Sequence, residues 1–106
     1  MALFASPVIE KVLEIAVALG NRPELLILDE PTVGMTPEEL GDMISVVRRA
    51  HEKFHLAIFL IEHRLRVVRE LCQHVQALVF GEVLVEGKPD DVQNHPKVIE
   101  AYIGEE

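Results

Sequence analysis

Asp29 and Glu30 are the side chains of this sequence best suited to chemistry, because two carboxylates stand together directly after an apolar run. One carboxylate can hold Mg²⁺ while its neighbour orients or deprotonates a water. The run before them, Leu25 to Leu28, shows no alternation, which is typical of a strand buried on both faces in a parallel sheet. Ligands of open α/β sheets bind at the carboxyl ends of such strands. An ordinary strand end followed by an acidic turn would look the same, so the pair alone does not establish nucleotide chemistry.

A second apolar run, Leu56 to Ile61, predicts another buried strand, and it also ends in polar residues, Glu62 and His63. A helix is predicted before each strand. The first begins at Ser6-Pro7 and stops at Gly20. The second begins at the capping-box string Thr36-Pro37-Glu38-Glu39 and runs to about Lys53. Helices and strands in this order predict parallel strands joined by crossover helices.

The remainder of the chain predicts a hairpin and short helices. A third helix spans about Leu65 to Leu71, and we expect Leu65, Val68, Leu71 and Cys72 to face inward. Strands at 75–80 and 83–86 are joined by a tight turn at Gly81-Glu82. Short helices follow from Gly87 to about Gln93 and from His95-Pro96 to near Gly104. The predicted fold class is α/β, with a parallel sheet, crossover helices and a C-terminal β-hairpin.

Length and charge narrow the class of protein. The 106 residues suit one domain covering residues 1–106. A net charge of -8 with no basic cluster argues against nucleic-acid or anionic-membrane partners. No stretch is apolar and long enough to insert directly into a bilayer. Cys72 is the single cysteine, so no internal disulfide can form, which fits a reducing, cytoplasmic location.

These strings together resemble the C-terminal half of an ATP-binding (ATPase) subunit of an ABC transporter, in particular the importers of branched-chain amino acids and related compounds such as urea. The resemblance covers about Lys11 to Gly104. It implies that Asp29 is the Mg²⁺-side carboxylate of the Walker B strand, that Glu30 is the catalytic base and that His63 senses the γ-phosphate. It also implies a P-loop NTPase fold, Mg-ATP as cofactor and ATP-driven import as the parent function. The tail strings of that importer group are Val85-Glu86-Gly87-Lys88-Pro89 and the residues from Val92 to Gly104.

Two departures qualify what the resemblance implies. No stretch reads G-x-x-x-x-G-K-[ST], so the Walker A half of the family's site is not encoded here. Where the family has Leu-Ser-Gly-Gly-Gln, this sequence has residues 5–9, in which Ser6 remains but Pro7 and Val8 replace both glycines. We therefore expect no binding of Mg-ATP by this chain alone, and its status as an enzyme stays open. The alternative is a stand-alone oligomerising or regulatory remnant without catalysis.

The absence of the Walker A half from this sequence also determines which partners we expect. In the family the phosphate-loop strand lies between the strands at 56–61 and 75–80. Without it those strands must either pair directly or expose their edges, and exposed edges recruit another chain. We expect a homo-oligomer, with a partner ATPase or a membrane permease subunit as further partners. Bound to a permease, the chain would lie at the cytoplasmic side of the inner membrane.

One further string, His51-Glu52-Lys53-Phe54-His55, matches the zinc-protease pattern H-E-x-x-H. That mechanism needs both histidines on one helix face. Here the string falls where the helix should end, and no third ligand follows at short range. The sequence therefore favours an ordinary helix end over a zinc site.

Overall fold

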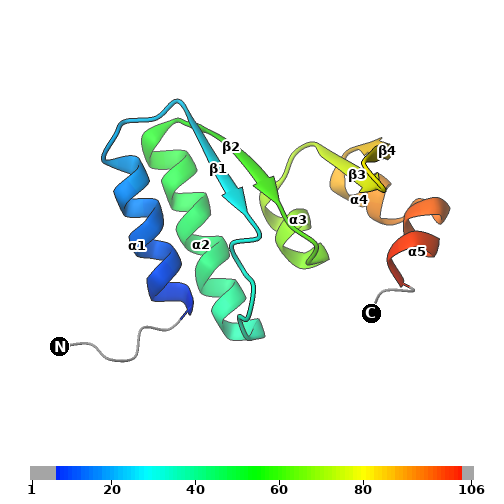
Figure 1. The fold of residues 1–106 in the computed structure, drawn as a ribbon, viewed down its shortest axis with the longest axis horizontal. Helices are drawn as coiled ribbons and strands as arrows, with labels where there is room; N and C mark the ends of the chain where they lie inside the picture. The colour runs from blue at the N-terminus through cyan, green and yellow to red at the C-terminus, as the bar shows by residue number, and fades with distance from the viewer. Residues whose placement is uncertain (1–6, 104–106) are drawn as a thin grey trace. The chain divides into compact units, whose positions relative to one another are not determined.

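The computed structural model describes residues 7–103, without the side chains of residues 102 and 103 (Figure 1). The chain divides into two compact units, one ending at His63 and the other beginning at Arg64. The single domain expected from the sequence stays a prediction. Within the described part, no helix is both long and apolar enough to cross a membrane.

The first unit is an α-β-α-β arrangement. Its elements are α1 (Pro7–Leu19), β1 (Leu25–Asp29), α2 (Pro37–Phe54) and β2 (Ala57–Ile61). The two strands pair in parallel through the α2 crossover, in an unbroken register from Leu25 opposite Ala57 to Asp29 opposite Ile61. Figure 1 shows α1 and α2 side by side, and the two helices contact each other. The predicted order of these elements is confirmed.

Local sequence explains why α2 begins and ends where it does. The Thr36 hydroxyl accepts a hydrogen bond from the Glu39 amide at 3.2 Å, and the Glu39 carboxylate accepts one from the Thr36 amide at 3.0 Å. This capping box satisfies amides that no earlier turn can reach. At the other end His55 adopts a left-handed conformation with φ 52°, which stops the helix. The buried stripe of α2 comprises Leu40, Met43, Ile44, Val47 and Ala50.

The burial of β1 on both faces was a wrong prediction. Leu26 and Leu28 are buried, but Leu25 and Ile27 are 53 % and 61 % exposed. Across the pair Phe59 is also exposed, at 57 %. Figure 1 shows both helices of the unit on the same side of the strands. An apolar run predicts that both faces are suited to burial, whereas within the described part helices cover only one.

The strand pair is also narrower than the sequence suggests. An apolar run such as residues 25–28 is typical of an inner strand of a parallel sheet, but among the described residues β1 pairs only with β2. Of the two alternatives for the missing strand, direct pairing between 56–61 and 75–80 is not observed. The strand at 75–80 lies in a separate two-stranded sheet. The described strands therefore keep open edges.

The second unit contains α3 (Leu65–Leu71), β3 (Val75–Val79), β4 (Glu82–Gly87), α4 (Pro89–Gln93) and α5 (Pro96–Ile103). Strands β3 and β4 form the predicted antiparallel hairpin. Its turn is Phe80-Gly81, with φ 50° and 79°, rather than Gly81-Glu82. Positive φ at both central residues matches the twist of two-residue hairpins. The core of the unit comprises Ala77, Val92 and Val98.

The inward face of α3 differs from the prediction at one end. Val67 is the buried residue of the helix, at 1 % exposure, whereas Leu65 is 44 % exposed. A helix of seven residues makes only two turns, so its apolar spacing does not fix which side faces the core. Cys72 is partly buried, as expected, and burial raises the pKa of its thiol. A raised pKa keeps a thiol protonated and unreactive, which supports a packing role.

A polar cluster lies on the β3–β4 hairpin. Hydrogen bonds from Gln76, and then from His74, lower the pKa of the exposed Glu86 carboxyl. Such a contact pairs residues across the two strands. It lies on the surface of the second unit and does not involve the residues singled out for chemistry.

Candidate functional site

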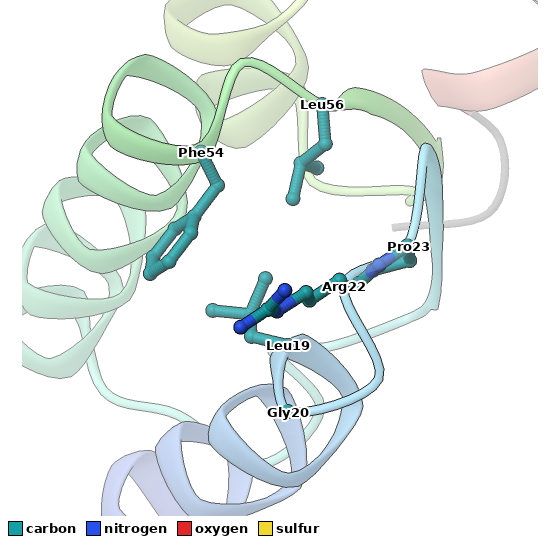
Figure 2. Close-up of a pocket in the computed structure, with 6 residues that line it drawn as sticks. All are labelled: Leu19, Gly20, Arg22, Pro23, Phe54 and Leu56. Carbon is teal, nitrogen blue, oxygen red and sulfur yellow. The ribbon is translucent and has the colours of Figure 1, made fainter.

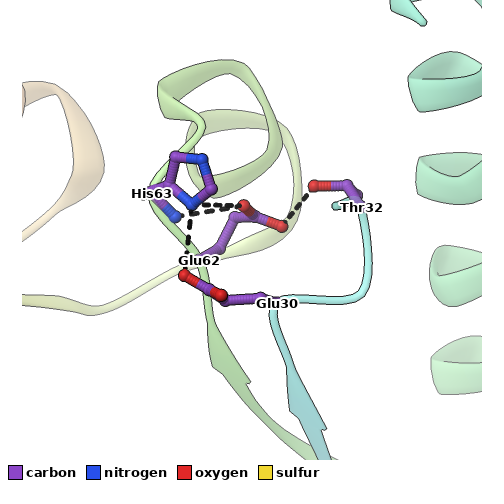
Figure 3. A network of polar contacts seen from close by, with 4 residues as sticks. All are labelled: Glu30, Thr32, Glu62 and His63. Atoms are coloured by element: carbon purple, nitrogen blue, oxygen red, sulfur yellow. Dashed lines mark hydrogen bonds and ion pairs between the residues drawn. The ribbon is translucent and has the colours of Figure 1, made fainter. Parts of the chain in front are cut away.

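The chemistry-bearing residues of the first unit leave the sheet at one edge. Asp29 ends β1 directly opposite Ile61, which ends β2. One residue further, the Glu30 amide donates a hydrogen bond to the Ile61 carbonyl at 2.7 Å. Parallel strands in this register deliver their next residues to the same carboxyl edge. Glu30 and His63 therefore emerge side by side, as Figure 3 shows.

Glu30 turns the chain sharply at this edge. Its φ of 46° lies in the left-handed region, which costs a residue with a Cβ about 1 kcal/mol or more. Pro31 and Thr32, which follow, are buried. The side chain of Glu30 stays 48 % exposed, and its Oε1 lies 3.3 Å from Nδ1 of His63. A carboxylate at this distance can hold the imidazole in one orientation and remain accessible to a water.

Glu62 lies behind this pair and is the most enclosed charged group at the edge. Its side chain is 0 % exposed. Oε2 accepts a hydrogen bond from the Thr32 hydroxyl at 2.6 Å, and Oε1 accepts one from the His63 amide at 3.0 Å (Figure 3). The same Oε1 lies 3.6 Å from Nδ1 of His63. Nδ1 of His63 thus faces two carboxylates, those of Glu30 and Glu62.

Asp29 is exposed at the end of β1. Among the described residues, no group of three or more His, Cys, Asp or Glu side chains could hold a metal ion by itself. Mg²⁺ does not need such a group, because it keeps several waters and commonly takes one or two carboxylates together with substrate phosphates. The single carboxylate of Asp29 therefore fits a magnesium ion that arrives with a phosphate.

The sequence also pointed to Ser6 and to the H-E-x-x-H string as possible sites. Ser6, the remaining residue of the degenerate signature, lies outside the described residues. The H-E-x-x-H string does not form a ligand pair: α2 ends at Phe54, and His55 has left the helix. Nδ1 of His51 is also 2.8 Å from the Leu56 carbonyl. The structure thus supports the ordinary helix end.

A pocket of about 460 Å³ opens at the opposite end of the strands (Figure 2). It adjoins the residues that precede β1 and β2, far from the carboxyl edge. Its lining combines apolar side chains with one guanidinium and comprises Leu19, Gly20, Arg22, Pro23, Phe54 and Leu56. It contains none of the residues singled out for chemistry, so the candidate site is the carboxyl edge.

Sequence reasoning missed the contact between Thr32 and Glu62. The two residues are 30 positions apart, and neither follows a local pattern that pairs them. The available signal was indirect, because both residues come within three positions of the paired strand ends. Two residues that closely follow two paired parallel strands are candidates for contact with each other, even when neither has a known role.

Comparison with known proteins agrees with this fold. Residues 82–106 match the family described as branched-chain amino acid ATP-binding cassette transporter. The chain is 34 % identical over 93 residues to the high-affinity branched-chain amino acid transport ATP-binding protein BraF of Pseudomonas aeruginosa, covering 88 % of this chain and 36 % of that protein. It is 36 % identical over 94 residues to the probable branched-chain amino acid transport ATP-binding protein LivG of Archaeoglobus fulgidus, covering 89 % and 36 %.

Solved structures give the same result. The chain superposes on an ATP-binding cassette of an ABC transporter in its ADP conformation with a TM-score of 0.84 and 32 % identity, covering 94 % of this chain and 41 % of that one. A nucleotide-free cassette gives a TM-score of 0.83 at 31 % identity, with the same coverage. The fold and the matched sequences therefore define the class: the chain is a relative of the ATP-binding cassettes of ABC transporters. Within that class it is related to the branched-chain amino acid group, as its sequence predicts. It spans about a third of the length of the curated relatives that it matches.

Proposed function

We propose that this chain supplies the magnesium, water and γ-phosphate-sensing half of an ABC-transporter ATPase site. The observation that carries the proposal is the pair of Glu30 and His63, 3.3 Å apart at the carboxyl edge beside Asp29. In this proposal Asp29 holds Mg²⁺ delivered with ATP. Glu30 orients and deprotonates the attacking water, and His63 contacts the γ-phosphate.

The phosphates themselves need a different kind of group. Backbone amides at a glycine-rich loop and a helix N-terminus are the usual cradle for them. These 106 residues contain no G-x-x-x-x-G-K-[ST] string. A polypeptide stretch with such a loop therefore completes the proposed site, and the chain by itself is not competent to bind or hydrolyse ATP.

The proposed parent function is ATP-driven import of branched-chain amino acids or similar solutes. The names of the matched relatives, branched-chain amino acid transport ATP-binding proteins, support this substrate class. In this role the chain lies in the cytoplasm, peripheral to the inner membrane, and contacts a permease subunit. A solved relative described as a dimeric ATP-binding cassette is 24 % identical and supports the fold alone. Pairing with another ATPase copy is also part of the proposal, because the described strands keep open edges that can recruit another chain.

Calorimetric titration of the isolated chain with Mg-ATP tests whether this chain lacks the phosphate-binding half of the site. We expect no binding at micromolar concentrations, because Asp29, Glu30 and His63 offer no amide cradle for the phosphates. Glu30→Gln serves as the comparison, since removing one negative charge should not create a site. Micromolar binding by the unaltered chain would contradict the proposal and show that residues of this chain hold the phosphates.

The second candidate function is a stand-alone oligomerising or regulatory module without catalysis. The open strand edges of β2 and the exposed Ile27 and Phe59 favour it. Parallel sheets are normally covered on both faces, and unpaired edges recruit further strands.

Light scattering between about 10 µM and 500 µM tests self-association through β2. We expect the mass to rise above that of one chain. Phe59→Lys should lower the apparent association constant by about tenfold or more, because a buried lysine is costly at an interface. Val17→Lys is the matched control, since Val17 is 74 % exposed and belongs to α1 rather than to a strand. A mass of one chain throughout, or equal losses in both variants, would count against oligomerisation through this strand.

A further inference from the structure

Glu62 combines a charge with complete enclosure, which needs a physical reason. Its side chain is 0 % exposed, while the neighbouring Glu30 and His63 are about half exposed. Burying a carboxylate is costly unless hydrogen bonds replace its water. Two such bonds are present, and each uses a different oxygen of the carboxylate. The length of the bond from Thr32, 2.6 Å, is typical of a hydroxyl that donates to an ionised acceptor.

Thr32 and His63 both act as donors to Glu62, which makes the carboxylate hard to replace. The Thr32 hydroxyl and the His63 amide each donate to it. A glutamine of the same shape has one acceptor oxygen and one NH₂ group. In either orientation its NH₂ would face a donor, so one of the two bonds would be lost. An apolar side chain would fill the space but lose both.

These bonds connect the two strand exits. Thr32 stands two residues after Glu30, and Glu62 stands directly before His63. The loop after β1 is therefore tied to the residue after β2 by the Thr32 side chain, in addition to the backbone bond from Glu30 to Ile61. These two hydrogen bonds at one edge fix the direction in which the loop leaves the sheet. The 3.3 Å separation between Glu30 and His63 depends on that direction.

We propose that Glu62 is a positioning residue, which holds the Glu30 loop and His63 in one relative geometry through Thr32. It contacts no substrate and acts through its two neighbours. Its meaning for catalysis rests on the proposed ATPase function, whereas its effect on geometry can be measured in the chain without nucleotide. Thr32 takes part in the same positioning, because its hydroxyl donates a hydrogen bond to Oε2 of Glu62.

The test is nuclear magnetic resonance of the labelled 106-residue chain without nucleotide. Two quantities report on the geometry: solvent exchange of the His63 amide, and cross-relaxation between the His63 ring and the Glu30 side chain. The variants are Glu62→Gln, Thr32→Val and Thr32→Ser. Glu52→Gln is the matched control, because Glu52 is an exposed glutamate of α2. Amide resonances of α2 report whether each variant is folded.

Glu62→Gln should speed exchange of the His63 amide by about tenfold or more, because its charge-assisted hydrogen bond is either lost or replaced by a bond to a neutral amide oxygen. It should also remove the contact between His63 and Glu30. Thr32→Val should remove the same contact, although residue 32 is far from His63 in sequence. Thr32→Ser keeps the hydroxyl and should restore the contact, and Glu52→Gln should leave it unchanged. Persistence of the contact in a folded Glu62→Gln or Thr32→Val variant would overturn the proposal.

If the Glu62→Gln variant fails to fold, Thr32→Val and Thr32→Ser still test the proposal, because they change only the residue that donates to Glu62. Equal loss of the contact in these two variants would overturn the proposal, because the serine keeps the hydrogen bond. Failure of the proposed ATPase function is a different result. It would appear as absent hydrolysis in a completed cassette, with the geometry of Glu30 and His63 unaffected.

Discussion

Replacing Glu30 by glutamine is expected to reduce ATP hydrolysis by about 10²–10⁴-fold in a cassette completed with this chain, the range typical of losing a general base. The cassette is a hybrid in which residues 11–103 replace the corresponding part of BraF of Pseudomonas aeruginosa, a relative at 34 % identity over 93 residues, so that the degenerate residues 5–9 are left out. Glutamine keeps the shape of Glu30 but cannot accept a proton from water. Binding of Mg-ATP should persist, because Glu30 is proposed to hold the water and not the phosphates.

Steady-state phosphate release and equilibrium ATP binding measure the two parts of this expectation separately. Glu52→Gln in the same hybrid is the control, because it removes an equal charge from an exposed position of α2. Asp29→Asn should instead weaken the binding of Mg-ATP, since Asp29 is the proposed magnesium ligand. Hydrolysis by Glu30→Gln within a few-fold of the unaltered hybrid would show that another group takes the proton.

The elements of the first unit could be predicted because their signals are local. Thr36, Pro37 and Glu39 specify the start of α2 within four residues, and the structure contains the capping box that they predict. The buried stripe of α2 recurs at helical spacing over about three turns, long enough to fix its inward face. The seven residues of α3 are too few for that, and Leu65 was placed on the wrong side.

The carboxyl edge was predictable for a related reason. Two apolar runs separated by one helix indicate parallel strands, and parallel strands deliver Glu30 and His63 to one edge. The left-handed turn at Glu30 and the contact from Thr32 to Glu62 were not predictable. Both depend on how two chain segments 30 residues apart meet in three dimensions, and neither residue type favours the outcome by itself.

The exposed face of β1 shows a different limit. The apolar residues Leu25 and Ile27 led to the prediction that both faces of β1 are buried, but sequence does not say what covers a face. Roughly half of each side chain stays exposed in the described part. The favourable free energy from burying these side chains is therefore only partly realised in the first unit, so its stability depends strongly on the one face that is packed.

That dependence gives the second large effect: Met43→Ala should lower the free energy of unfolding of the first unit by about 2–5 kcal/mol. Met43 is 1 % exposed in the stripe of α2, so its truncation leaves a cavity. Small domains are stable by only about 5–15 kcal/mol, and with an m-value of about 1–3 kcal/mol/M the urea midpoint should fall by about 1–3 M. Far-UV circular dichroism follows this transition, because α1 and α2 contain most of the helical residues.

Val17→Ala is the matched control, since it also removes side-chain carbons from a helix of the same unit but at a position that is 74 % exposed. Its midpoint should stay close to that of the unaltered chain, because substitutions at exposed positions commonly change stability by less than about 0.5 kcal/mol. A fall as large for Val17→Ala as for Met43→Ala would mean that the exposed side of α1 is covered in solution by another copy. Dilution distinguishes that case, because a midpoint set by self-association decreases with protein concentration, whereas a midpoint set by the packing of α2 does not.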